Sequence, residues 1–266
     1  MDLGLKDRVA IVTGAGRGLG AGIARALAEE GVRVVIVDRD GPAGRRVAER
    51  IGGGALAIQA DVADRSSVRA MVEQVLGAFG RIDILVNNVG LTLADWVEDI
   101  RDEDIERTFA VNMRSHLFCT QAVVAPMKAA RWGRLIYLSS GSGLKASAGM
   151  ALYSASKYFI RGLGVAVGLE LGRYNITANV VCPSDVYPED EEAPATWLEE
   201  NLRRISMVKE GVESFEALRT KRIAANPMRR ACTVRDVADV VVFLASERAG
   251  FVNAQSIAVN GGSIPT

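Results

Sequence analysis

Short apolar runs alternate with stretches of helical spacing along almost the whole chain. The apolar runs are rich in Val, Ile, Leu and Ala, which is typical of strands buried on both faces; they cover residues 8–13, 32–37, 55–60, 82–86, 134–138, 176–181 and 256–259. The stretches between them repeat apolar residues three or four positions apart, which predicts helices over residues 21–30, 42–51, 66–79, 102–129, 151–173 and 234–245. This alternation predicts an α/β fold, a doubly wound parallel sheet of about seven strands with helices on both faces.

Residues 185–226 break this rhythm. They form a charged insert in which some apolar residues, among them Trp197, Leu198 and Ile205, have helical spacing. No linker or internal repeat divides the chain, so we expect residues 1–266 to form a single domain.

The amino-acid composition indicates which classes of partner and which cellular compartment to expect. Thirty-two basic and thirty-two acidic residues give no formal net charge, which favours neither a nucleic-acid nor a membrane partner. The three cysteines are widely spaced without a Cys-x-x-Cys pair, which is typical of reduced thiols. Charges precede the first apolar run, and no run approaches the ~20 apolar residues of a membrane span. We therefore expect a cytoplasmic protein without a signal peptide.

A glycine-rich turn, Gly14-Ala15-Gly16-Arg17-Gly18-Leu19-Gly20, separates the first strand from the first helix. Glycine lets the backbone approach a pyrophosphate closely, and the helix amino terminus supplies N–H groups and a partial positive charge. An acidic residue, Asp38, ends the next strand, as in dinucleotide-binding folds of the Rossmann type. Together these features predict a bound dinucleotide.

Asp38 also bears on the identity of that dinucleotide. A carboxylate at this position can accept hydrogen bonds from both ribose hydroxyls, and it repels a 2′-phosphate. Arg17 and Arg39 could partly neutralise Asp38, but we interpret them as ordinary surface charges. We therefore expect NAD in preference to NADP.

Tyr153 and Lys157 are four residues apart in the helix predicted over residues 151–173, so they share one face of it. Tyrosine has a pKa of about 10, and a cation held close favours the phenolate and lowers that pKa. On its own the pair is more typical of a solvated helix face than of a site, so its meaning depends on the residues around it.

These motifs resemble the short-chain dehydrogenase/reductase family, and the resemblance covers nearly the whole chain. The turn Thr13-Gly14-x-x-x-Gly18-x-Gly20 is similar to the family's nucleotide turn, and Asn87-Asn88-Val89-Gly90 is similar to its Asn-Asn-Ala-Gly segment. The positions of the family's catalytic set, with the serine thirteen residues before the tyrosine, are occupied here by Asn112, Ser140, Tyr153 and Lys157.

The resemblance implies an oxidoreductase that transfers a hydride between a nicotinamide cofactor and a secondary alcohol or ketone, with a polyol or sugar-derived substrate among the options. Tyr153 would be the general base or acid, and Lys157 would lower its pKa and hold the nicotinamide ribose. Ser140 would bind the substrate oxygen, and Asn112, in the long fourth helix, would position a water leading from Lys157 to solvent. The cofactor contacts implied in the same way are Gly14, Arg17, Gly18, Leu19, Gly20, Asp38, Asp61, Val62, Asn88, Gly90, Tyr153, Lys157, Pro183 and Val186.

Two positions depart from the family pattern. Ser184 follows Pro183 where the family usually has glycine, and Pro188 stands where a threonine often holds the nicotinamide carboxamide. Proline has neither a backbone donor nor a hydroxyl, so we expect the backbone of Val186, or another residue of the insert, to hold the carboxamide. The resemblance further implies that residues 185–226 form a lid over the substrate and that the protein is a homotetramer or homodimer. A packed helical pair that never moves is an equal alternative to the lid.

Two other functions remain open. An NADP-dependent 3-oxoacyl-carrier reductase would have the same catalytic set, but Asp38 argues against NADP. A regulator that binds NAD without turnover belongs to another class, and the complete Asn-Ser-Tyr-Lys set argues against it. His116 is the only histidine, so we expect neither a hydrolase triad nor a metal site and interpret it as structural.

Overall fold

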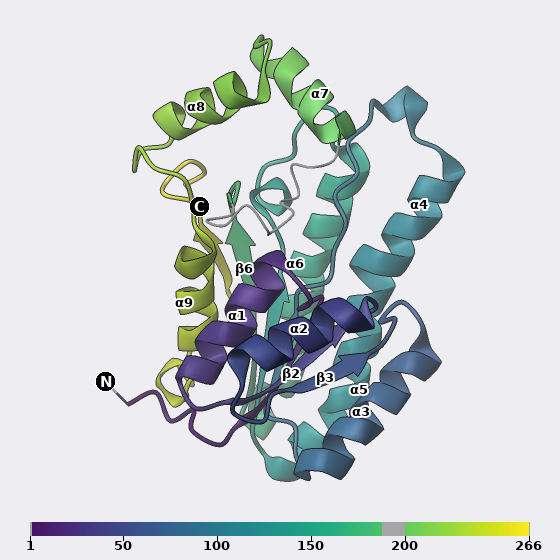
Figure 1. The fold of residues 1–266 in the computed structure, drawn as a ribbon, viewed down its shortest axis with the longest axis vertical. Helices are drawn as coiled ribbons and strands as arrows, with labels where there is room; N and C mark the ends of the chain where they lie inside the picture. Colours follow the sequence, from purple (N-terminus) through teal and green to yellow (C-terminus); the bar gives the residue numbers. More distant parts are fainter. Residues whose placement is uncertain (1, 188–199, 266) are drawn as a thin grey trace.

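The computed structural model describes residues 2–187 and 200–265. In these residues, seven parallel strands form one sheet in the order β3-β2-β1-β4-β5-β6-β7, which confirms the predicted fold class (Figure 1). The strands are β1 (Val9–Thr13), β2 (Arg33–Asp38), β3 (Leu56–Gln59), β4 (Ile84–Asn87), β5 (Gly133–Leu138), β6 (Ile176–Pro183) and β7 (Ser256–Val259). Since all strands run in one direction, their carboxyl ends share one edge of the sheet.

Helices cover both faces of this sheet. The α-helices of the described residues are α1 (Gly18–Glu29), α2 (Gly41–Ile51), α3 (Arg65–Phe79), α4 (Asp102–Thr108), α5 (Ser115–Ala130), α6 (Ala151–Leu171), α7 (Glu200–Glu210), α8 (Phe215–Ala225) and α9 (Val234–Ala245). Within this described part, no helix combines the length and the apolar character needed to cross a bilayer.

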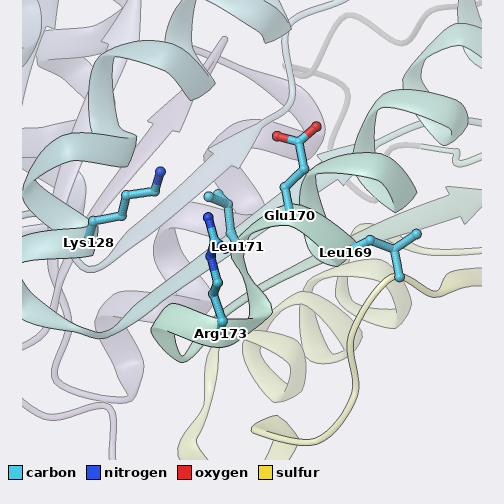
Figure 2. Close-up of a pocket in the computed structure, with 5 residues that line it drawn as sticks. All are labelled: Lys128, Leu169, Glu170, Leu171 and Arg173. Carbon is cyan, nitrogen blue, oxygen red and sulfur yellow. The ribbon is translucent and has the colours of Figure 1, made fainter.

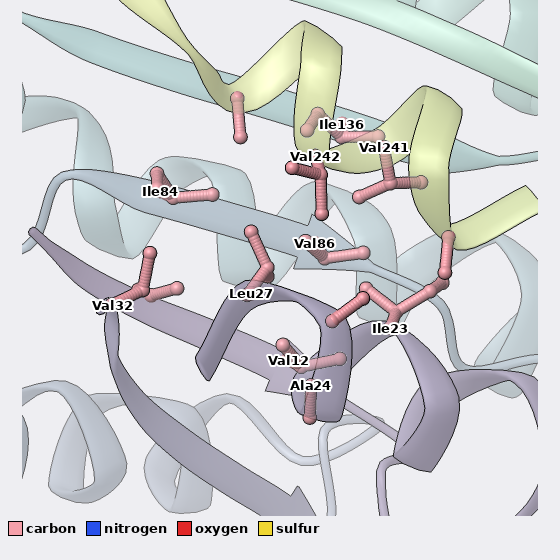
Figure 3. Close-up of a cluster of buried hydrophobic side chains, with 14 of the residues drawn as sticks. Val12, Ile23, Ala24, Leu27, Val32, Ile84, Val86, Ile136, Val241 and Val242 are labelled. Carbon is pink, nitrogen blue, oxygen red and sulfur yellow. The ribbon is translucent and has the colours of Figure 1, made fainter. Parts of the chain in front are cut away.

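Alternate residues of the strands build two separate cores. In β1, Val12 faces the core formed with α1 and α9, while Ile11 faces the core formed with α3, α5 and α6. Figure 3 shows the first core, where Ile23 and Leu27 of α1 lie between the sheet and α9. This two-sided burial explains why the strand sequences are apolar without alternation.

The sheet order reverses at β1, which pairs with β2 on one side and β4 on the other. In a doubly wound sheet, such a reversal leaves a crevice beyond the carboxyl ends of the two central strands. The glycine turn follows β1, and Asn88 follows β4, so both predicted motifs lie at this crevice.

One predicted helix is wrong in detail. Instead of a continuous helix over residues 102–129, α4 passes into a π-helical segment, Phe109–Arg114, before α5 begins. A π turn accommodates one additional residue, and such turns are frequent at functional sites. Here the segment contains Asn112, whose side chain is fully buried.

The insert contributes α7 and α8, which lie beyond the carboxyl ends of the strands (Figure 1). Ile205 of α7 and Leu218 of α8 form a small core with Ala94 and Tyr187. Pro188, Trp197 and Leu198 lie outside the described residues.

Candidate active site

A cavity of about 1030 Å³ opens at the carboxyl edge of the sheet. It brings together all but one of the predicted site residues: Gly14, Arg17, Gly18, Leu19, Gly20, Asp38, Asp61, Val62, Asn88, Gly90, Ser140, Tyr153, Lys157, Pro183 and Val186 line it. The exception is Asn112, which is fully buried behind the wall.

A second hollow of about 370 Å³ lies elsewhere, between the ends of α5 and α6 (Figure 2). It is lined by Lys128, Leu169, Glu170, Leu171 and Arg173, which precede β5 and β6 in the chain. The hollow therefore lies at the amino edge of the sheet, and none of the predicted site residues borders it.

The glycine turn is held in place by Asn88. Its side-chain amide donates to the carbonyl oxygens of Thr13 at 2.9 Å and of Gly14 at 3.2 Å. A Cβ on Gly20 would lie 2.4 Å from the Gly14 oxygen, so this helix start requires glycine. Asn88 thus holds the turn in place, and its side-chain amide donates its hydrogen bonds to the protein backbone.

The carboxylate of Asp38 is fixed at the entrance to α2. Its Oδ2 accepts from the N–H of Gly16 at 2.9 Å and its Oδ1 accepts from the N–H of Asp40 at 3.0 Å. Each carboxylate oxygen can accept a further hydrogen bond. Both oxygens can therefore still bind ribose hydroxyls on the cavity side.

At the other end of the cavity, the Tyr153 hydroxyl lies near the hydroxyls of Ser140 and Thr92, which lower the pKa of the phenol. Ser140 also accepts from the N–H of Ser142 at 3.1 Å, which begins the short 3₁₀ turn Gly141–Gly143 after β5. This turn fixes the Ser140 hydroxyl beside Tyr153. The serine and the tyrosine, thirteen residues apart in sequence, therefore lie beside each other on the cavity wall.

Burial of the Tyr153 phenol raises its pKa above the ordinary value, although the neighbouring hydroxyls of Ser140 and Thr92 lower it in part. The predicted lowering of this pKa by Lys157 stays a prediction. The Lys157 ammonium lies 5.6 Å from the centre of the Tyr153 ring and donates to the carbonyl of Leu138 at 3.0 Å. Burial lowers the pKa of Lys157 itself to about 8. The low-dielectric pocket thus disfavours the charged form of both residues.

Space around Lys157 is limited on the side of Gly90. A Cβ on Gly90 would lie 3.3 Å from the Lys157 nitrogen and 3.7 Å from Oδ1 of Asn112. Glycine at this position therefore leaves the ammonium room to lie against the cavity.

The side chain of Asn112 is fully engaged within the protein, and its water-positioning role stays a prediction. Its Oδ1 accepts from the N–H of Leu91 at 2.8 Å, and its Nδ2 donates to the carbonyl of Leu91 at 2.9 Å and to Ser156 Oγ at 3.0 Å. The side chain therefore ties the segment after β4 to the π-helical segment and to α6. Its three hydrogen bonds are those of a satisfied buried amide.

Val186, whose backbone we expect to hold the carboxamide, lines the cavity. It forms an isolated parallel bridge with Cys232, in which the neighbouring Tyr187 N–H donates to the Cys232 carbonyl. Within the described part of the chain, the N–H of Val186 itself has no hydrogen-bond acceptor. Pro188, the other residue that bears on carboxamide binding, lies outside that part.

Two residues of the site were missed from the sequence. Thr92 belongs to no recognisable motif. Only its hydroxyl group and its place two residues after the Asn-Asn-Val-Gly segment could have indicated a role in the site. Asp185 lies on the cavity wall and was counted only as the first residue of the charged insert. His116, by contrast, is buried and stacked on Tyr137 with ring centres 6.4 Å apart, and burial lowers its pKa to about 3.

The cavity fits an extended dinucleotide. Gly18 lies at the glycine-lined end of the cavity. A Cβ on Gly18 would have no neighbour within 4 Å, so there is open space beside the turn. The other end of the cavity reaches Tyr153 and Lys157, with the fixed carboxylate of Asp38 along the way. Such a cavity can hold the phosphates at the turn and a reactive ring beside the tyrosine.

Comparisons with known proteins agree with this geometry. A family model described as short chain dehydrogenase matches residues 8–196. The chain is 34% identical to the galactitol 2-dehydrogenase of Agrobacterium fabrum, over 97% of this chain and 98% of that protein. It is 33% identical to the (2S)-[(R)-hydroxy(phenyl)methyl]succinyl-CoA dehydrogenase subunit of Thauera aromatica, over 98% of each chain.

A solved structure, the 3-ketoacyl-(acyl-carrier-protein) reductase of Brucella melitensis complexed with NADH, superposes with a TM-score of 0.83 at 28% identity, covering 98% of this chain and 100% of that one. The family match and the full-length relatives show the same relationship that the motifs predicted. The chain belongs to the short-chain dehydrogenase family.

Proposed function

We propose that the protein is an NAD-dependent oxidoreductase that interconverts a secondary alcohol and a ketone. The observation that carries this proposal is the position of Tyr153 and Ser140 side by side in the cavity that also contains the glycine turn and Asp38. A proton-transfer group and a dinucleotide cradle within one cavity are what hydride transfer requires.

In alcohol oxidation, Tyr153 takes the hydroxyl proton of the substrate, and the Ser140 hydroxyl stabilises the charge that develops on the substrate oxygen. When bound, nicotinamide supplies the hydride acceptor and a positive charge. Because burial raises the pKa of Tyr153, that charge and Lys157 are needed to make the phenolate accessible. In ketone reduction, the Tyr153 phenol returns the proton.

Lys157 holds the nicotinamide ribose in this proposal, while its bond to the Leu138 carbonyl fixes the ammonium. Asp38 holds the adenosine ribose, and its charge supports NAD over NADP. Asp61 and Val62 line the adenine end, and the unbonded N–H of Val186 supports a role in holding the carboxamide.

The similarity to the galactitol 2-dehydrogenase supports a polyol or sugar-derived substrate. The second candidate is an NADP-dependent 3-oxoacyl-carrier reductase. The similarity to the 3-ketoacyl reductase supports its reaction, but that structure contains NADH, and the Asp38 carboxylate argues against NADP. A non-catalytic NAD-binding regulator has no observation in its favour.

The remaining proposals concern the whole protein. We propose that residues 1–266 act as one dinucleotide-binding and catalytic domain in the cytoplasm, with residues 185–226 as a lid. A homotetramer or homodimer is supported by exposed apolar side chains on α6 and near β7, where Leu169 is 74% exposed and Phe251 is fully exposed. Light scattering gives the assembly directly, since each chain has a mass of 28.4 kDa.

A cofactor and substrate panel tests the function. Secondary alcohols, polyols and ketones are assayed with NAD(H) and with NADP(H), and we expect substrate-dependent NADH formation with little activity toward NADP. Asp38→Ala, which removes the carboxylate, should relax the preference against NADP by about tenfold or more. An unchanged cofactor preference in this variant would refute the role of Asp38, and no turnover on any substrate would refute the enzymatic function.

A further inference from the structure

Asp185 places a carboxylate on the wall of the catalytic cavity. It follows β6 directly after Pro183 and Ser184, at the edge of the sheet where Tyr153 lies. Its side chain is 41% exposed, and the surface it exposes belongs to the cavity wall. Its charge is close enough to Tyr153 to raise the pKa of the phenol.

Only one of the two carboxylate oxygens of Asp185 is held by a hydrogen bond from the described part of the protein. Oδ2 accepts from Arg222 Nη1 of α8 at 2.8 Å. Across the described ranges, 2–187 and 200–265, no donor reaches the other oxygen, Oδ1. An acceptor with a fixed orientation and an unused oxygen inside a substrate cavity has the chemistry to bind a donor on the ligand.

The cavity wall around Asp185 is rich in hydroxyl groups. Thr92, Ser142, Ser147, Ser184 and Ser206 line the same cavity as Asp185, from four different parts of the chain. Such a wall offers both donors and acceptors to a ligand with several hydroxyls, whereas a hydrocarbon ligand would leave these groups without partners.

Several cations line the cavity, but those around Asp185 are paired or exposed, and Arg107, which also lines the cavity, is exposed. Arg222 is paired with Asp185, and it also lies 3.8 Å from Glu210. Lys209 of α7 lines the cavity but donates to the hydroxyl of Ser147 at 3.0 Å, and Lys145 is exposed at its edge. An anionic group beside Tyr153 would meet the Asp185 carboxylate, which repels it.

We infer that Asp185 is a specificity-determining residue that accepts a hydrogen bond from a second hydroxyl of the substrate, so that the enzyme selects polyhydroxylated alcohols over alcohols with one hydroxyl. Arg222 is the positioning residue that holds the carboxylate. This inference rests on the proposed alcohol oxidation and assigns its substrate class. It makes α8, through Arg222, a part of substrate recognition.

The test compares specificity ratios rather than single rates. Hexitols and butane-2,3-diol are assayed against butan-2-ol, which differs from the diol by one hydroxyl, and kcat/KM for each polyol is divided by kcat/KM for butan-2-ol. In Asp185→Ala this ratio should fall by about tenfold or more, mainly through KM, because a charge-assisted hydrogen bond is lost. Asp185→Asn has the same shape and should keep the fold while lowering the ratio less.

Glu210→Gln is the matched control. It removes the other carboxylate near Arg222 but leaves Asp185 in the cavity, so the ratio should stay within about twofold of the wild type. An equal fall of the ratio in Glu210→Gln would show that the effect comes from loosening α7 and α8, and it would overturn the inference.

The remaining outcomes separate the inference from the function on which it rests. A wild-type enzyme that oxidises butan-2-ol as well as the polyols, or an unchanged ratio in both Asp185 variants, overturns the inference and leaves alcohol oxidation standing. A wild type that forms no NADH with any alcohol and consumes none with any ketone overturns both.

Discussion

At the scale of single residues, the site is built from groups whose charged forms the protein disfavours. Burial raises the pKa of Tyr153 and lowers that of Lys157 to about 8. Lys157 is only 5% exposed and has one hydrogen bond, to the Leu138 carbonyl, to compensate for lost hydration. Such an arrangement costs stability, which is common for residues kept for function.

This cost makes stability depend on pH in a defined direction. The pKa of Lys157 is lowered from 10.5 to about 8, so between these values the unfolded chain binds more protons than the folded one, and stability rises with pH. Lys157→Met should therefore increase the free energy of unfolding at pH 7 by about 1–3 kcal/mol. The gain should disappear as the pH approaches 10.5, where the lysine is neutral in both states.

Urea unfolding of both proteins at a series of pH values measures this difference. Lys6→Met, at an exposed position, controls for the change of side chain. A Lys157→Met protein that is less stable than the wild type at pH 7 would show that the ammonium contributes more through its bonds than burial costs.

At the scale of elements, the π-helical segment between α4 and α5 connects the helices to the candidate active site through Asn112. The sequence predicted one long helix here, because apolar spacing continues through residues 102–129 and a single extra residue hardly changes it. The π-helical segment coincides with a long-range contact, the bonding of Asn112 to the backbone of Leu91. Helix spacing cannot reveal such a contact.

Asn112→Ala tests the role of this contact. Three buried hydrogen bonds are lost, and the N–H and carbonyl of Leu91 lose their side-chain partner, so the variant should be destabilised by about 2–4 kcal/mol as measured by urea unfolding. Ser154→Ala is the control, because Ser154 Oγ is buried without a hydrogen-bond partner in the described structure and its loss should cost little. A nearly neutral Asn112→Ala would contradict the anchoring role of Asn112.

At the scale of the whole molecule, the sequence predicted the fold class, and all but one of the site residues that its motifs identified lie on the cavity wall. The strands are recognisable because they are apolar throughout, and the glycine turn and Asp38 because their chemistry depends on near neighbours. The rest depends on contacts between distant parts of the chain. Asn88 holds Thr13 and Arg222 holds Asp185, and neither pairing leaves a periodic signal in the sequence.

The central proposal is that Tyr153 transfers the proton in a cavity that binds NAD independently of it. Tyr153→Phe removes the hydroxyl and keeps the ring, so calorimetry should give an NAD Kd within about threefold of the wild type. NADH formation from the best alcohol should fall by a factor of about 10²–10⁴, the usual contribution of general acid–base catalysis. Wild-type turnover by Tyr153→Phe with NAD bound would contradict the proposed mechanism.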